Sequence, residues 1–488
     1  MRQDGTNKRY PGYDHDRRWR ELVFPDNYRN PEPRRRYHLV VIGAGPAGLV
    51  ASIAAAGLGA RVALVEKQAM GGDCLNAGCV PSKSLLEFTR RNPGADFDEA
   101  FAWLRKVRSE IAAHDSVERY RQMGVDVFLG PARFADGKSV EVGGRLLSAR
   151  RFLIATGARA GLPRIPGLQD CDALTNESFF DLVEPPRRLA ILGAGPVGCE
   201  LSQPMARLGI EVHLFEMAER VLPGATAAAS AALETALEAD GVRLHLASKV
   251  SRVSQQGGRP TIHAAGGSVT VDRLLVAAGR RANVEDLNLA AAGVELRGGR
   301  IAVDDRLRTT NRKIYAAGDV CSRLPFTHNA DAQARIVVRN ALFAPSASIR
   351  ALVIPQCTYT DPEVAQVGRT EAELAEEGVV FDALKLKFGE LDRGRTSGDR
   401  EGLVELLTAA GSDRILGASI VGHDAGEQIA PLCLAMANGL GLGAVGKSVL
   451  PYPTRAEYLR RLADEHARTR LTPRVRCLMK AWFRYAVR

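Results

Sequence analysis

The chain has 488 residues, of which 45% are hydrophobic, 25% are charged and 6% are aromatic. This composition excludes disordered and fibrous proteins, and the length predicts about three domains that each bury a core. The net charge of +10 lies at the chain ends: residues 1–36 carry +4, residues 466–488 carry +7, and residues 37–465 carry −1. Residues 37–465 are therefore nearly neutral, and the sequence contains no recognisable nucleic-acid-binding motif. Nucleic-acid binding is not predicted.

Residues 1–36 are charged and contain no apolar signal region, which predicts a cytoplasmic protein with reduced thiols. Their proline-rich sequence predicts an extended basic arm whose Tyr, Trp and Phe side chains contact the body. The eight cysteines are mostly scattered singly, so they do not indicate the disulfide framework of a small secreted domain.

Residues 37–66 have the pattern strand, glycine turn, helix, strand, which predicts one βαβ unit. The uncharged stretch 39–60 is long enough to cross a membrane, but its glycines and proline favour a strand followed by a helix. The pattern returns at 188–216, and in both copies an acidic residue follows the first glycine by 23 positions. The two sets are Gly43, Gly45, Gly48 and Glu66, and Gly193, Gly195, Gly198 and Glu216.

Each set predicts a dinucleotide site, since glycines let the backbone approach a pyrophosphate and the carboxylate binds a ribose. Two such sites in one chain indicate a permanently held flavin, FAD, and a nicotinamide that exchanges. The carboxylate of Glu216 would repel a 2′-phosphate, so we expect NADH to be preferred over NADPH. Arg220, nearby in the sequence, leaves that preference open.

The rest of the chain predicts a return to these sheets and then a separate domain. Short apolar strands at 273–279 and 313–320 end in glycine and are expected at the sheet edges. From about residue 348, several strand-like runs are followed by helical stretches at 425–440 and 455–465, which predicts an α+β domain.

Cys74 and Cys79 lie in the sequence GGDCLNAGCVPSK, residues 71–83. Two thiols at this spacing can close a local disulfide at the start of a helix, where the helix dipole favours a thiolate. Two unrelated buried cysteines are the alternative, and a zinc site is poorly supported because no second Cys/His pair lies nearby. No metal site is predicted.

The motifs GAGPAG, GGDCLNAGCVPSK, ATG, GAGPVGCE, AAGRRAN, YAAGDV and TYTDPEVAQVG resemble, in this order, the class I pyridine nucleotide–disulfide oxidoreductases. The resemblance implies an α/β fold with two Rossmann-like domains, for FAD and NAD, and a C-terminal α+β domain that forms a homodimer. The implied boundaries are a basic arm at 1–36, the FAD domain at 37–187 and 276–347, the NAD domain at 188–275, the dimerisation domain at 348–465 and a basic tail at 466–488.

The resemblance also implies roles for single residues. Cys79 would be the thiol next to the flavin, Cys74 the exposed interchange thiol, and Lys83 would lie near the flavin and pair with Glu200. Electrons would pass from NADH through FAD to the Cys74–Cys79 disulfide and on to a small-molecule or disulfide acceptor. Further cofactor contacts would be Ala132, Thr156, Gly157 and Asp319 on the FAD side and Val250 and Gly279 on the nicotinamide side.

Residues 450–457, LPYPTRAE, depart from the family's His-x-His-Pro-Thr-x-x-Glu sequence. Tyr452 stands where the second histidine would act as acid–base, while Glu457 remains; a phenol of pKa ~10 is a poor base at neutral pH. Tyr452 is either a substrate-facing phenol or a packing residue at the dimer interface. The same Pro-Tyr occurs in mercuric reductases, so a mercuric or other metal-ion reductase is the alternative, although the adjacent terminal cysteine pair is missing.

Residues 472–488 predict a basic amphipathic helix, with apolar residues at helical spacing and arginines largely elsewhere. Such a helix lies either on an anionic membrane surface, at the inner face of the cell membrane, or on the dimer. A third possible function is therefore a membrane-surface flavoprotein that carries electrons to a partner protein.

Overall fold

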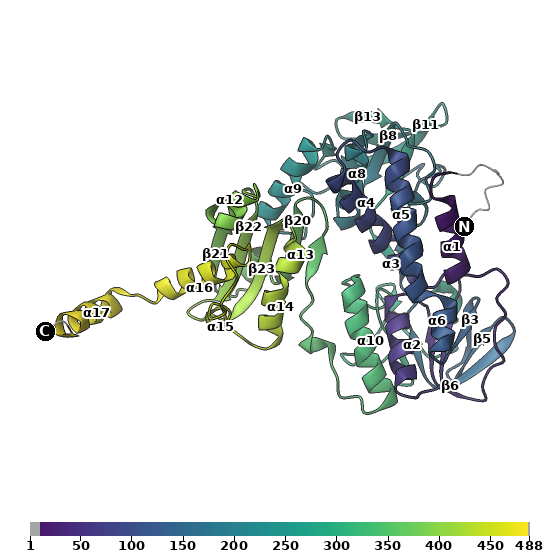
Figure 1. The fold of residues 1–488 in the computed structure, drawn as a ribbon. Helices are drawn as coiled ribbons and strands as arrows, with labels where there is room; N and C mark the ends of the chain where they lie inside the picture. Colours follow the sequence, from purple (N-terminus) through teal and green to yellow (C-terminus); the bar gives the residue numbers. More distant parts are fainter. Residues whose placement is uncertain (1–9, 487–488) are drawn as a thin grey trace. The chain divides into compact units, whose positions relative to one another are not determined.

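The computed structural model describes residues 10–486 (Figure 1). The chain forms two compact units. The first contains the chain up to residue 217 together with residues 240–352, and the second contains residues 218–239 and the chain from residue 353 onward.

The first unit contains a 7-stranded sheet whose middle strands are parallel. Strand β1 pairs with β2 and β6, and β18 comes from far along the chain to pair with the end of β6. Strands β1 and β2 are rich in Val, Leu and Ile because a central parallel strand is buried on both faces. The strands are β1 Tyr37–Ile42, β2 Val62–Glu66, β3 Val125–Leu129, β4 Ala132–Asp136, β5 Ser139–Val142, β6 Arg145–Ile154 and β18 Ile314–Ala316.

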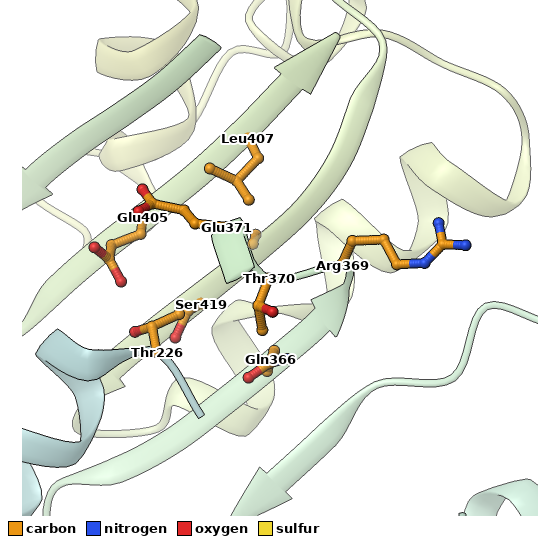
Figure 2. Close-up of a pocket in the computed structure, with 9 residues that line it drawn as sticks. Thr226, Gln366, Arg369, Thr370, Glu371, Glu405, Leu407 and Ser419 are labelled. Carbon is orange, nitrogen blue, oxygen red and sulfur yellow. The ribbon is translucent and has the colours of Figure 1, made fainter. Parts of the chain in front are cut away.

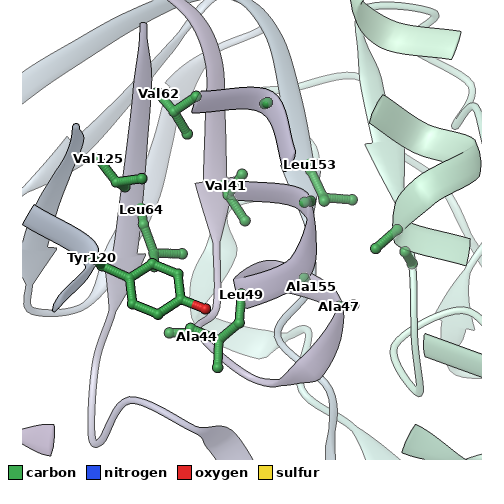
Figure 3. Packing of buried hydrophobic residues seen from close by; sticks show 14 of the residues in the cluster. Val41, Ala44, Ala47, Leu49, Val62, Leu64, Tyr120, Val125, Leu153 and Ala155 are labelled. Atoms are coloured by element: carbon green, nitrogen blue, oxygen red, sulfur yellow. The ribbon is translucent and has the colours of Figure 1, made fainter. Parts of the chain in front are cut away.

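Helix α2 (Pro46–Gly57) packs on one face of this sheet and on α10 (Thr327–Leu342). Figure 3 shows Val41 and Leu64 of the sheet beside Leu49 of α2. Pro46 is the first helical residue, where a missing N–H costs nothing, and the alanines that follow favour the helix. The helix therefore begins directly at the glycine turn.

The second βαβ unit forms a 4-stranded parallel sheet in the order β10-β9-β8-β14, flanked by a three-stranded antiparallel sheet. A short antiparallel pair, β7 with β15, lies between the two nucleotide-binding units in sequence. The elements are β7 Ala158–Ala160, β8 Arg188–Leu192, α8 Pro196–Arg207, β9 Glu211–Phe215, β10 Arg243–His245, β11 Val250–Gln256, β12 Arg259–Ala264, β13 Gly267–Thr270, β14 Arg273–Val276, β15 Arg280–Ala282, β16 Leu296–Arg297 and β17 Arg300–Ile301.

The expectation of an extended N-terminal arm is wrong for part of the segment, because Tyr13–Val23 forms helix α1. Asp16, Trp19 and Val23 are buried along one side of this helix, at spacings of three and four residues. The charged residues between them conceal this pattern in the sequence. The other helices of the unit are α3 Gly72–Ala77, α4 Cys79–Arg91, α5 Phe97–Ala112, α6 Val117–Gln122 and α7 Asn176–Phe179.

The second unit is built on a 5-stranded antiparallel sheet in the order β19-β20-β23-β22-β21. Apolar residues of this sheet pack with Leu432 of α14 and with Leu459 and Leu462 of α16. The elements are α9 Ala227–Ala239, β19 Gln356–Thr358, β20 Glu363–Gly368, α11 Glu371–Glu376, β21 Phe381–Lys387, α12 Asp392–Thr396, β22 Leu403–Ala409, β23 Ile415–Gly422, α13 Ala425–Gln428, α14 Ala430–Ala437, α15 Leu442–Val445, α16 Glu457–Thr469 and α17 Pro473–Ala486.

The predicted fold class is confirmed: two Rossmann-like parallel sheets, each carrying a glycine turn, and a C-terminal α+β unit. Stretch 39–60 contains β1 and α2, as the glycines indicated. Among residues 10–486, none of the helices is both long and apolar enough to cross a membrane.

Candidate redox-active site

The first glycine turn joins β1 to α2. Gly43 has φ +103°, and a Cβ on Gly48 would lie 1.8 Å from the Gly43 carbonyl oxygen. Glu66, at the end of β2, accepts hydrogen bonds from the backbone N–H of Ala44 at 2.7 Å and of Gln68 at 2.8 Å. Burial raises the pKa of this carboxyl. The turn is thus shaped for a pyrophosphate at the N-terminus of α2, as FAD requires.

The second turn, between β8 and α8, has the same geometry. Gly193 has φ +100°, and a Cβ on Gly198 would lie 1.9 Å from the Gly193 carbonyl oxygen. Glu216 accepts a hydrogen bond from the Ala194 N–H at 2.8 Å. A second dinucleotide fits here on the same physical grounds.

The segment that carries Cys74 and Cys79 lies directly against the first turn. The Gly71 N–H donates to the Ala44 carbonyl at 2.9 Å, and a Cβ on Gly72 would lie 2.5 Å from the Cα of Gly45. Cys74 lies in α3, Cys79 is the first residue of α4, and both side chains are partly buried. The glycines therefore bring the cysteine pair to the proposed FAD turn.

The environment of Cys79 favours its thiolate. The Cys74 thiol donates to Cys79, and the charge of Lys83 and the Thr327 hydroxyl add to this effect, so the pKa of Cys79 is lowered despite burial. Thr327 is the first residue of α10, and its Oγ1 lies 3.4 Å from Cys79 Sγ. The same hydrogen bond, together with burial, raises the pKa of Cys74. The surroundings thus favour the thiolate on Cys79 and the proton on Cys74.

Lys83 connects the cysteine-bearing helix to the second nucleotide-binding unit. Its Nζ lies 2.6 Å from Oε2 of Glu200, on α8. The Glu200 side chain is only 6% exposed, so a nearby positive charge stabilises it strongly. The structure thus contains the Lys83–Glu200 pair that the resemblance implied.

Asp319 follows β18 at the end of the chain's return to the first sheet. Arg280 Nε lies 3.5 Å from Asp319, and its Nη2 lies 2.6 Å from Asp73, the residue before Cys74. Burial raises the pKa of Asp319, which Arg280 opposes. Neighbouring Gly318 packs against Ala47 of α2, so this acid lies at the first turn.

The structure places the other predicted cofactor contacts on loops and at the starts of strands. Thr156 donates to the Asn283 carbonyl at 2.7 Å, and the Gly157 carbonyl accepts from the Asn283 N–H at 3.0 Å. The Gly279 carbonyl accepts from the Gly161 N–H at 2.9 Å. Ala132 begins β4, and Val250 begins β11.

Tyr452 and Glu457 belong to the second unit. The Tyr452 hydroxyl donates to Asp392 Oδ2 at 2.7 Å, and this hydrogen bond raises the pKa of the phenol. Glu457, the first residue of α16, accepts from Arg461 Nε at 2.9 Å. The tyrosine is therefore a hydrogen-bond donor rather than a base at neutral pH.

A small cavity of about 10 Å³ lies on the sheet of the second unit (Figure 2). Its lining includes Glu405, which pairs with Lys385 at 2.8 Å, and Ser419. The volume is that of a single water molecule, so this cavity does not bind a nucleotide or an organic substrate.

Three site features were missed in the sequence. Thr327 had no cysteine motif around it, and its position depends on how α10 packs. Arg280 belongs to the quoted sequence AAGRRAN, but its pairing with Asp73 joins residues 207 positions apart. Trp19 and Asn76, which are hydrogen-bonded at 2.8 Å, lie in segments whose contact only the folded chain creates.

Residues 37–334 match the family "Pyridine nucleotide-disulphide oxidoreductase", and residues 354–463 match the dimerisation domain of that family. The chain belongs to this family, whose members are FAD-dependent enzymes that use NAD(P)H and act on sulfur groups. The dimerisation domain supports assembly into a homodimer.

Among individual proteins, the chain is similar to a mercuric reductase of Bacillus cereus (34% identity over 88% of this chain and 72% of the relative). It is also similar to a dihydrolipoyl dehydrogenase of Thermus scotoductus (34% identity over 88% of this chain and 97% of the relative). The solved structure of the HOCl-induced flavoprotein disulfide reductase RclA from Escherichia coli, a Cu(II) complex, matches with a TM-score of 0.82 at 29% identity, over 88% of this chain and 99% of that one.

Proposed function

We propose that this flavoprotein disulfide reductase passes electrons from NADH through FAD to the Cys74–Cys79 pair and from there to a small acceptor. The observation that carries this proposal is the position of the cysteine pair directly against the first glycine turn, with the Thr327 hydroxyl 3.4 Å from Cys79 in surroundings that lower the pKa of this thiol. FAD, when bound, supplies a carrier that takes a hydride from the nicotinamide and gives two electrons to the disulfide.

Cys79 and Cys74 then have different roles at the disulfide. Reduction breaks the S–S bond with two electrons, and Cys79 stays ionised because Cys74, Lys83 and Thr327 stabilise its charge. Cys74, which takes up a proton, is the thiol that attacks or ligates the acceptor after deprotonation.

An anaerobic NADH titration tests this relay. The protein should take up two electron pairs per subunit, one for the flavin and one for the disulfide, and Cys74→Ser should take up only one. Cys477→Ser, at an exposed cysteine of α17, is the matched control and should behave as the unaltered protein. If the unaltered protein takes up only one electron pair, and the Cys74→Ser variant takes up the same amount, the relay is excluded.

NADH is the proposed donor because of the carboxylate of Glu216 in the second turn, which would repel a 2′-phosphate. Glu216→Gln keeps an oxygen for the Ala194 N–H but removes the charge. We expect the ratio of kcat/KM for NADPH to that for NADH to rise about tenfold, which corresponds to about 1.4 kcal/mol. Steady-state kinetics with both nucleotides measures this ratio, and equal use of the two by the unaltered protein would contradict the preference.

A thiophilic metal ion is the second candidate for the acceptor. It is favoured by the similarity to mercuric reductases and to RclA, whose structure is a Cu(II) complex, and by Tyr452, which is no substitute for a histidine base. Two thiolates can ligate such an ion, and one electron pair reduces one Hg(II) to Hg(0) or two Cu(II) to Cu(I).

An NADH-oxidation screen separates the acceptor classes. Hg(II), Cu(II), small disulfides and quinones are compared at equal concentration, with Cys74→Ser alongside. Turnover with a metal ion that Cys74→Ser abolishes supports metal-ion reduction. Turnover with a disulfide alone excludes it, and turnover that survives Cys74→Ser places the acceptor at the flavin instead.

We also propose that α17 contacts an anionic membrane surface. Leu478, Trp482 and Phe483 of this helix are exposed, Trp482 by 64%, while Arg474, Arg476, Lys480 and Arg484 supply positive charge. Basic amphipathic helices with aromatic residues bind anionic lipid in this way.

Vesicle flotation of the full-length protein tests this contact. It should float with phosphatidylglycerol vesicles but not with phosphatidylcholine vesicles, and Trp482→Ser should reduce flotation. Trp103→Ser, at a half-exposed tryptophan of α5, is the control. Absence of flotation, with loss of the homodimer in Trp482→Ser, would show instead that the apolar face of α17 contacts the partner subunit.

A further inference from the structure

Helix α1 precedes the part of the chain that matches the family, yet it contacts the covalent loop that a Cys74–Cys79 disulfide would close, residues 74–79, most of which is the end of helix α3. The indole Nε1 of Trp19 donates to Asn76 Oδ1 at 2.8 Å, and Arg108 Nη1 donates to the Asn76 main-chain carbonyl at 3.1 Å. Asn76 lies between Cys74 and Cys79 in the sequence. The N-terminal segment therefore contacts the middle of the redox-active loop.

Trp19 is itself held rigidly. It is 2% exposed, and the guanidinium carbon of Arg108 lies 4.0 Å from the centre of its ring. Asp16, one turn earlier on α1, lies 2.7 Å from Arg108 and 3.3 Å from Arg105, and both arginines are buried in α5. Buried charges that are paired in this way fix the geometry around them, because any displacement leaves a charge without its partner.

Asn76 links Trp19 to the backbone that precedes Cys74. Because its Oδ1 accepts from Trp19, its amide nitrogen is directed to carbonyls of the preceding turn, Met70 at 3.0 Å and Gly72 at 2.8 Å. The Met70 N–H in turn donates to the carbonyl of Val23, the last residue of α1. The chain before Cys74 is thus bonded to α1 twice, once directly and once through Asn76.

We propose that Trp19 is a positioning residue for the Cys74–Cys79 pair and that it stabilises the disulfide relative to the dithiol. This inference rests on the proposed relay. The disulfide takes up two electrons and two protons to give two thiols, and Cys79 then releases its proton. A disulfide constrains its own loop, whereas the dithiol loop depends on other contacts for its order. Loss of the Trp19 bond therefore increases the conformational entropy of the dithiol form more than that of the disulfide form, which shifts the equilibrium towards the dithiol.

The test substitution is Trp19→Phe, which keeps an aromatic ring under Arg108 and removes the indole N–H together with part of the ring. The full-length holoenzyme is equilibrated anaerobically with dithiothreitol and its cyclic disulfide, and the fraction of Cys74–Cys79 dithiol is measured by thiol alkylation and mass spectrometry. One hydrogen bond should shift the equilibrium about fivefold towards the dithiol. For a two-electron couple, this fold-change is about 20 mV towards a more positive potential.

Two comparisons separate positioning from a general loss of stability. Trp103→Phe makes the same change on α5, away from the loop, and should leave the equilibrium constant unchanged. Asn76→Ala, which also removes the bonds to Met70 and Gly72, should shift the equilibrium at least as far in the same direction, and Trp19→Phe should add nothing in that background, because the acceptor of its bond is then absent. The rate of FAD reduction by NADH should remain as in the unaltered protein in Trp19→Phe.

An equilibrium constant that Trp19→Phe leaves unchanged, or that Trp103→Phe shifts equally, would overturn the positioning role. If Cys74→Ser still removes one electron pair from the NADH titration, the proposed relay survives that result. If Cys74→Ser changes nothing in the titration, the relay itself is wrong, whatever Trp19→Phe shows.

Discussion

The thiolate of Cys79 depends on a small number of neighbours whose contributions can be separated. Cys74 donates a hydrogen bond, Lys83 supplies a positive charge, and Thr327 supplies a hydroxyl at 3.4 Å. Glu200 acts in the opposite direction, because its negative charge raises the pKa of Cys79. The Lys83–Glu200 pair therefore sets a balance: the lysine stabilises the thiolate while the glutamate holds the lysine in place.

Lys83→Met removes the positive charge and leaves the negative one. We expect the apparent pKa of Cys79 to rise by about one unit or more. The thiolate exists above the pKa of the folded protein, so the variant should lose it at a higher pH than the unaltered protein. A pH titration of the long-wavelength absorbance of the two-electron-reduced enzyme, which reports a thiolate beside the flavin, measures the midpoint.

The control for this titration is Lys385→Met, which breaks a Lys–Glu pair of similar length on β21 and β22 in the second unit. It should leave the midpoint in place. An unchanged midpoint in Lys83→Met would mean that the Cys74 and Thr327 contacts maintain the thiolate without the lysine.

At the level of secondary-structure elements, α1 shows how a charged sequence can form part of a core. Asp16 lies among the buried residues of the first unit because Arg105 and Arg108 of α5 neutralise it. The cost of burying three charges is offset only while all partners are present. The helix is thus attached to α5 by charge as well as by apolar contact.

Asp16→Asn leaves two buried arginines with one partner fewer. We expect the free energy of unfolding to fall by about 3 kcal/mol, as measured by urea denaturation of the holoenzyme. Asp14→Asn, on the same helix, removes an exposed carboxylate paired with Arg17 and should change stability by less than about 0.5 kcal/mol. Equal effects of the two substitutions would contradict the structural role of the buried charges.

The βαβ units could be predicted from the sequence because their signals are local: apolar strands, glycine turns and an acid at a fixed distance. Cys74, Cys79 and the Lys83–Glu200 pair followed from the family's motifs. The helix α1 and the Trp19–Asn76 bond could not be predicted in this way. Burial of Asp16 depends on Arg105 and Arg108, about 90 positions later, and local composition contains no sign of them.

For the whole molecule, the basic excess of the sequence lies in two end segments that differ in how they pack. The N-terminal residues 10–36 are fixed on the first unit, with Tyr28 and Asn30 hydrogen-bonded to β3 and Arg34 paired with Asp126. The positive charge of α17 is exposed throughout. The arginines of residues 10–36 are themselves exposed, so both ends of the described chain keep their positive charge at the surface, but the N-terminal end packs on the body through its other side chains.

The two glycine turns have nearly the same geometry, with φ +103° and +100° at the first glycine and carboxylate contacts of 2.7 and 2.8 Å. FAD and NAD share an adenosine diphosphate half, which is the half that such turns bind. A newly folded chain therefore has two sites that can bind the same adenosine diphosphate group. Excess NAD⁺ should slow FAD loading of the apoprotein, measured as the loss of free flavin fluorescence, so the order in which the cofactors arrive becomes part of how the enzyme matures.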